Sequence, residues 1–139
     1  MKRISCILTV TVLMVFLFLT GCDFYKDQPS EFYWIPEESY FAGYEIVDDK
    51  VVFAYSICFV NDGEEDYAVN VSAKFKRSEL SKWVEYKDFF LGSAEDETVK
   101  AGTKKNITYY YEGKYLGGEV NTELSFPEEM IVNSYFPQQ

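Results

Sequence analysis

The chain has 139 residues and a formal net charge of −10, with 23 acidic residues, 13 basic residues and no histidine. This length accommodates one small domain. The absence of histidine excludes Ser-His-Asp and Cys-His nucleophilic mechanisms and most zinc sites, because they need an imidazole that is neutral near physiological pH. The acid excess opposes nucleic-acid binding, which depends on Lys and Arg neutralising phosphates. We therefore expect a noncatalytic protein with no metal, no cofactor and no nucleic-acid partner.

Residues 1–21 have the pattern of a signal peptide, in which a basic start at Lys2-Arg3 precedes an uncharged apolar run over residues 4–20. The segment ends in Leu19-Thr20-Gly21-Cys22, which resembles the lipobox of bacterial lipoproteins, with Leu at the third position before Cys and small residues next. The resemblance implies that the Cys22 thiol receives a diacylglyceryl group and that cleavage makes Cys22 the new N-terminus. An uncleaved transmembrane anchor is the alternative, because 17 uncharged residues are close to the length that spans about 30 Å of hydrocarbon.

Both forms of anchor place the remaining chain on the extracytoplasmic face of the cell membrane, and two acyl chains give a stable attachment. Cleavage before Cys22 removes 21 residues, which include the bases Lys2 and Arg3 and no acid. The remaining 118 residues contain 11 bases and 23 acids, which gives a net charge of −12. Such a charge is repelled by an anionic leaflet and attracts cationic partners. Cys58 is then the one cysteine without lipid, and its apolar surroundings predict a small buried side chain and no intrachain disulfide.

Residues 23–39 contain two prolines and no sustained periodicity, which predicts a tether. The segment also contains aromatic residues, including Tyr33 and Trp34, which a solvated linker normally lacks. We expect these rings to dock on the domain of the same chain, and contact with a partner or a glycan is the alternative. The expected organisation is a signal peptide at 1–21, a lipidated N-terminus and tether at 22–39, and a β-sandwich domain at 40–139.

From residue 40 onward the apolar pattern has the period of two that is typical of strands. Lys50 to Asn61 is mostly apolar on both faces, which predicts a central strand covered on both sides. The turn residues Asn61-Asp62-Gly63 and the alternating run from Tyr67 to Lys76 predict that the two segments form a hairpin. Arg77 to Asp88 is expected to be a loop with one helical turn, and 105–112 another strand.

Several short strands at hairpin spacing, almost no helix and no disulfide favour an all-β fold, and an antiparallel sandwich rather than a barrel. From Tyr44 onward the chain resembles the small immunoglobulin-like domains of many bacterial lipoproteins of unassigned function, through the strand ending 59–63, the turn 100–103 and the ending 124–127. The resemblance implies an immunoglobulin-like β-sandwich and no particular activity. The chain differs from antibody domains because it lacks their Cys pair and places Trp83 in a loop.

Tyr109-Tyr110-Tyr111 lies in an expected strand, where a period of two turns Tyr110 away from its neighbours. We favour cross-strand packing on the sheet surface for these residues. The alternative is that Tyr110, Tyr33 and Trp34 form an aromatic platform for a protein partner or for sugar rings. The acidic turn 62–66 lacks the EF-hand spacing, and we interpret it as a solvated loop rather than a calcium site.

These features predict a membrane-anchored extracytoplasmic lipoprotein that is noncatalytic and binds another envelope protein. Two alternatives stay open, a cell-wall glycan-binding accessory module and an acidic inhibitor of a cationic wall-degrading enzyme. An enzyme that depends on carboxylates alone is the least favoured, because close pairs of acids are expected by chance on so acidic a surface.

Replacement of the lipidated cysteine tests the anchor. We expect Cys22→Ala to lose the lipid and to remain uncleaved, because the thiol is the acceptor of the diacylglyceryl group. The mass of the protein recovered from membranes reports both changes. A Cys6→Ala variant, which removes a cysteine of the signal segment, is the control and should be processed like the parent. Equal processing of the Cys22→Ala variant would refute the lipobox.

Overall fold

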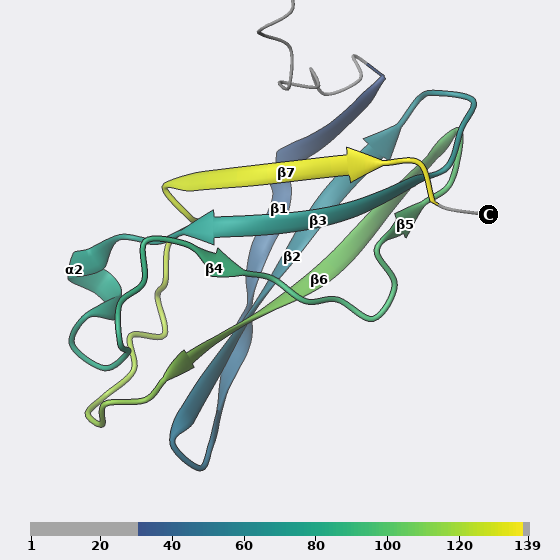
Figure 1. The fold of residues 1–139 in the computed structure, drawn as a ribbon. Helices are drawn as coiled ribbons and strands as arrows, with labels where there is room; N and C mark the ends of the chain where they lie inside the picture. Colours follow the sequence, from purple (N-terminus) through teal and green to yellow (C-terminus); the bar gives the residue numbers. More distant parts are fainter. Residues whose placement is uncertain (1–30, 138–139) are drawn as a thin grey trace, which may run out of the picture.

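The computed structural model describes residues 31–137, which form two antiparallel β-sheets packed face to face (Figure 1). The first sheet has the order β1-β2-β6, and the second has β3 in its centre, with β4 and β5 on one edge and β7 on the other. The strands are β1 (Phe32–Val47), β2 (Lys50–Asn61), β3 (Tyr67–Lys74), β4 (Phe90–Leu91), β5 (Thr98–Val99), β6 (Thr103–Lys114) and β7 (Glu129–Tyr135). The predicted all-β class and antiparallel sandwich are confirmed.

The predicted central strand is confirmed, because β2 pairs with β1 along one edge and with β6 along the other. Its odd-numbered side chains point into the space between the sheets and are fully buried. They are Val51, Phe53, Tyr55, Ile57 and Phe59. The alternation predicted for 67–76 is also confirmed, since Tyr67, Val69, Val71, Ala73 and Phe75 are all buried in the same core. Cys58 is buried, as expected, and on the opposite side of β2.

The hairpin predicted for 50–61 and 67–76 is wrong. β2 pairs with β1 and β6, whereas β3 belongs to the other sheet, so the turn at 62–66 carries the chain from one sheet to the other. Both strands present a large apolar face, and these faces pack against each other across the core instead of lying side by side. The predicted turn after Asn61 is present, but a turn motif does not specify which strands pair with each other.

The hairpin that does form joins β1 to β2 through Asp48-Asp49, since Val47 is paired with Lys50. Asp48 has φ of 57°, in the left-handed region that Asp adopts more readily than most residues. Strand β1 begins at Phe32, within the segment expected to be a tether, so the domain boundary expected at residue 40 falls inside a strand. Two register shifts interrupt β1, between Ile35 and Tyr40 and between Phe41 and Gly43, and they erase the period of two.

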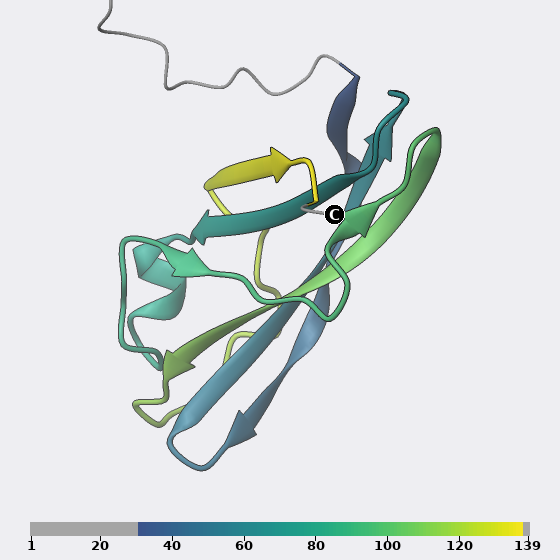
Figure 2. The same ribbon diagram turned by 45° about the vertical axis from the view of Figure 1, so that its right-hand side comes forward.

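Aromatic residues make up nearly half of the core between the sheets. The Phe53 ring lies 5.0 Å from that of Phe75, and it also contacts the rings of Trp83 and Tyr111. Trp83 lies in the loop that follows helix α2 (Arg77–Leu80), as predicted, and its side chain is nevertheless buried. The helix is the single turn expected in this segment. Figure 2 shows the helix and its loop at one end of the sandwich.

Residues 115–128 connect β6 to β7 and close part of the open side of the sandwich. Phe126 stacks on Trp34 with ring centroids 5.7 Å apart, and the Tyr55 hydroxyl donates a hydrogen bond of 3.0 Å to the carbonyl of Ser125. Val120 and Leu124 are buried with the core. This irregular segment thus contributes side chains to the core although it contains no strand.

No helix within residues 31–137 has the length and apolar character needed to cross a membrane. The signal peptide at 1–21, the lipidated Cys22 and the first part of the expected tether lie outside the described residues.

Two buried tyrosines of β6 give a test of the core. Tyr109 donates a 2.8 Å hydrogen bond to the carbonyl of Val69, whereas the Tyr111 hydroxyl is the one buried side-chain polar group within residues 31–137 that lacks a partner. Burial raises the pKa of both hydroxyls, so both are neutral at physiological pH.

We expect Tyr111→Phe to leave the free energy of unfolding unchanged or to raise it by up to about 1 kcal/mol, and Tyr109→Phe to lower it by about 1 kcal/mol. Urea unfolding of the full chain measures both. Equal losses in the two variants would contradict the assignment of the unpaired hydroxyl.

Candidate functional site

The outer face of the β1-β2-β6 sheet carries three exposed tyrosines. Directly paired residues of antiparallel strands point to the same side of a sheet, and the even-numbered residues of β2 point away from the core. Tyr33 is paired with Val60, Tyr40 with Ser56 and Tyr110 with Ala54, so all three tyrosines lie on this outer face. Their exposed fractions are 44%, 58% and 42%. We call this surface the tyrosine face.

Trp34 does not belong to the tyrosine face. It is paired with Phe59 on the inner side of the sheet, and its ring stacks on that of Phe126 with an interplanar angle of 7°. The platform predicted from Tyr33, Trp34 and Tyr110 therefore does not form as one surface, because consecutive residues of a strand point to opposite sides. The expectation that Trp34 docks on its own domain describes its position correctly.

Tyr40 takes the place of Trp34 on the outer face. Its partner Ser56 lies two residues along β2 from Ala54, the partner of Tyr110, and β1 and β6 are two strand spacings apart, which places the two Cα atoms about 12 Å apart. Tyr33 is farther along the same face, about 20 Å from Tyr110. Tyr40 was missed in the sequence because its direction depends on the register of β1 after the first shift, which periodicity does not reveal.

Small side chains form the floor between Tyr40 and Tyr110. Ala54 and Ser56 of β2 lie there, with Gly43 of β1 opposite Ala54. Gly43 has φ of +140°, a conformation that L side chains rarely adopt, and the register shift beside it depends on that freedom. A Cβ at this position would meet no atom within 4 Å, so the requirement for glycine comes from the backbone and not from space.

Charged groups border the tyrosine face at both ends. At one end Lys50 lies 2.5 Å from Glu112, and at the other the Lys104 ammonium lies 2.5 Å from both oxygens of the Glu38 carboxylate. The hydrogen bond from Lys104 lowers the pKa of Glu38. All four side chains are about half exposed. An aromatic centre with a charged, solvated border is the composition of many protein interfaces.

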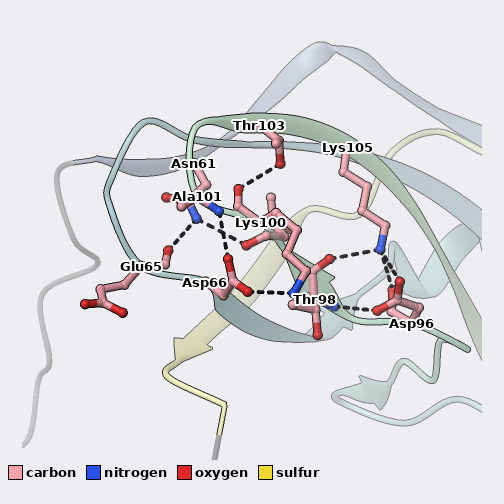
Figure 3. Close-up of polar contacts among 10 residues, drawn as sticks. Asn61, Glu65, Asp66, Asp96, Thr98, Lys100, Ala101, Thr103 and Lys105 are labelled. Atoms are coloured by element: carbon pink, nitrogen blue, oxygen red, sulfur yellow. Dashed lines mark hydrogen bonds and ion pairs between the residues drawn. The ribbon is translucent and has the colours of Figure 1, made fainter.

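The end of the sandwich where β2 ends and β6 begins carries the acidic loops 62–66 and 95–97, and Figure 3 shows their polar contacts. The buried Asn61 side chain organises the first loop: its amide N–H groups donate to the carbonyls of Glu65 and Val99, at 2.8 and 3.1 Å. Its side-chain oxygen accepts from the backbone N–H of Gly63 at 3.0 Å. This residue thus acts as a structural cap for the connection between the sheets.

Two carboxylates of these loops already accept hydrogen bonds from a lysine and from a backbone N–H group. Asp66 accepts hydrogen bonds from the Lys100 ammonium at 2.6 Å and from the backbone N–H of Ala101 at 3.0 Å. Asp96 accepts from the Lys105 ammonium at 2.5 Å and from the N–H of Thr98 at 3.0 Å. Within residues 31–137 no three acidic or thiol groups converge in a way that could hold a metal ion. Residues 62–66 form the connection between the two sheets, which is the loop that the sequence predicts.

Comparison of the chain with protein-family models, with curated proteins and with solved structures found no match. The resemblance to bacterial lipoproteins therefore stays a prediction from the sequence.

The acidic loops predict how stability depends on pH. The hydrogen bonds from Lys100 and Lys105 lower the pKa values of Asp66 and Asp96 from 3.8 in the folded state. Each carboxylate therefore stabilises the fold above pH 3.8, and this contribution is lost as the pH falls through its lowered pKa. We expect the double variant Asp66→Asn, Asp96→Asn to be less stable at pH 7 and to lose less stability on acidification than the parent.

Urea unfolding at pH 7 and at pH 3 measures the two free energies. Glu64→Gln, in the same loop as Asp66, is the control and should keep the pH dependence of the parent. A double variant with an unchanged acid dependence would contradict the role of the two ion pairs.

Proposed function

We propose that this protein is a lipid-anchored, extracytoplasmic and noncatalytic module that binds another protein of the cell envelope through the tyrosine face. The observation that carries the proposal is the arrangement of Tyr40 and Tyr110 around a floor of small side chains, with ion pairs at the border. Tyrosine supplies a large, rigid contact area at low entropic cost, and aromatic residues near the centre of an interface contribute most of its binding energy.

The distribution of charge supports a face of this kind. The chain is strongly acidic, yet the border of the tyrosine face carries two ion pairs, Lys50 with Glu112 and Lys104 with Glu38. Lys114 and Glu45 add one charge of each sign to the same face. At the end near Tyr33, whose hydroxyl donates to the Asp62 carboxylate at 3.2 Å, the face adjoins the acidic loop 62–66. A nearly neutral aromatic face does not repel a partner, while the remaining acidic surface limits nonspecific association.

The proposed anchor keeps this face close to the membrane. Eight residues lie between Cys22 and Glu31, and a chain of this length reaches about 31 Å at most even when fully extended. The carbonyl of Glu31 accepts a hydrogen bond from the N–H of Asp62, so the chain enters the domain at the end that bears the acidic loops. The tyrosine face then runs along the side of the domain, where a neighbouring membrane protein can reach it.

Substitution of the tyrosines tests the proposed function. The lipidated protein with a C-terminal tag is crosslinked on intact cells, and proteins recovered above an untagged control are identified. We expect Tyr40→Ala and Tyr110→Ala each to reduce recovery of the partner about tenfold, as for central aromatic residues of an interface. Tyr44→Ala is the matched control, because Tyr44 is also on β1 and 41% exposed but points to the inner side of the sheet.

The outcomes separate the alternatives. Loss of a single protein partner in the two variants but not in Tyr44→Ala supports the proposal. Retention on cell-wall polysaccharide that depends on the same tyrosines would replace it with glycan binding, in which sugar rings stack on the aromatic side chains. Salt-sensitive inhibition of a cationic wall-degrading enzyme that depends on the acidic loops would replace it with the inhibitor.

A further inference from the structure

Strand β1 leaves the sheet for four residues in the middle of the tyrosine face. Ile35 is paired with Cys58 and Tyr40 with Ser56, so residues 36–39 lie opposite Ile57 alone. This is a much larger irregularity than a simple bulge, which adds one residue. We call residues 36–39 the strap.

The strap bends over the outer face of β2 and is attached on both sides. On the β1 side, the Ser39 hydroxyl donates to the carbonyl of Ile35 at 2.7 Å and accepts from the backbone N–H of Cys58 at 3.0 Å. The hydroxyl thereby replaces the carbonyl that an uninterrupted β1 would offer to Cys58. On the β6 side, the Glu38 carboxylate binds Lys104, the residue paired with Val60 across the sheet.

Two weaker contacts complete the attachment. The Asn106 amide lies 3.4 Å from the carbonyl of Glu38 and 3.3 Å from the Ser56 hydroxyl. The Cys58 thiol lies 3.7 Å from the Glu38 carboxylate. The strap therefore spans the width of β2, from its own strand to β6, and is held by polar groups rather than by apolar packing.

On the outer face of β2, the residues under the strap are buried and those beyond it are partly exposed. Ser56 and Cys58 are 3% and 0% exposed, although neither belongs to the core between the sheets. Val52 and Ala54, on the same face of β2 but beyond the strap, are partly exposed. The strap thus covers the half of the floor that separates Tyr33 from the pair formed by Tyr40 and Tyr110.

We infer that the strap lifts from the sheet as a local opening, so that the tyrosine face exists in a covered and an uncovered form. Segments held by few hydrogen bonds open at lower free energy than the whole fold unfolds. The ion pair of the strap is about half exposed, and the two Ser39 hydrogen bonds are partly buried. Uncovering joins Tyr33 to the other two tyrosines through a continuous floor from Val52 to Val60. The covered form is then autoinhibited, and this last step rests on the proposed function.

Cys58 reports the opening, because its thiol is inaccessible in the covered form. The full-length protein in isolated membranes is treated with iodoacetamide, and alkylation is read from the tryptic peptide 51–74, in which Cys58 is the only cysteine. We expect the parent to react faster than global unfolding allows, with little change of rate at low urea concentrations. A rate that equals the global unfolding value and shares its urea dependence would overturn the inference.

Variants of the attachments sharpen the test. Loss of an exposed ion pair in Lys104→Met should speed alkylation about two- to fivefold. Ser39→Ala, which leaves the Cys58 N–H without its acceptor, should speed it about tenfold. Burial and the Glu38 carboxylate raise the pKa of the Cys58 thiol, and the Lys104 charge opposes this rise. Loss of the charge alone therefore does not make the thiol more reactive, and a faster reaction reports opening.

Lys105→Met is the matched control, because Lys105 is the adjacent residue of β6 and has an ion pair of the same length, but to Asp96. It should leave the alkylation rate within about 1.5-fold of the parent, since surface substitutions remote from the strap change its opening little. Equal acceleration by Lys104→Met and Lys105→Met would overturn the role of the strap.

Recovery of the crosslinked partner tests autoinhibition separately. Lys104→Met and Ser39→Ala should increase recovery at least about twofold, because the competent form is more populated. Faster alkylation without a change in recovery would overturn autoinhibition. Absence of any partner in all variants would refute the proposed function, while the alkylation rates, which need no partner, would still decide whether the strap opens.

Discussion

The structure depends on the burial of one aromatic face of β2 against the second sheet. Phe53 and Tyr55 lie at its centre, and Phe53 alone contacts the rings of Phe75, Trp83, Phe90 and Tyr111. The described residues contain one cysteine and no disulfide, so this apolar contact has to provide most of the stability. The rings come from both sheets and from the loop after α2, which explains how a domain with short strands and irregular connections forms one continuous core.

The buried side chains on the inner face fix the position of β2 in the domain. They thereby also fix the directions of the side chains on its outer face. Each residue of β1 and β6 takes its direction from its partner on β2, and this is why Tyr40 and Tyr110 lie on the same side although they are 70 positions apart in the chain. The outer face contributes little to the core, so its residue types are free to meet other requirements. The candidate binding surface is thus positioned by the core without being part of it.

Periodicity identified β2, β3 and β6 and their buried faces, because uninterrupted strands repeat every two residues. It failed for β1, where Pro36 and two register shifts break the repeat, and it did not identify strand partners, as the wrong hairpin shows. Within the candidate site, the direction of Tyr110 followed from Tyr109 and Tyr111. The same rule separates Tyr33 from Trp34 once the segment is recognised as a strand, whereas the position of Tyr40 depends on a register that only the three-dimensional pairing defines.

The return of β1 to the sheet at Tyr40 has a consequence for the evolution of the protein. The pairing after the strap is re-established by contacts of β1 with β2 that do not involve residues 36–39. Insertions, deletions and substitutions in this segment therefore change the outer surface without displacing a core side chain or altering the register of the following residues. A change of length within the strap therefore alters the outer surface at a smaller cost to stability than a change in the paired parts of β1, which would shift the register of every following residue.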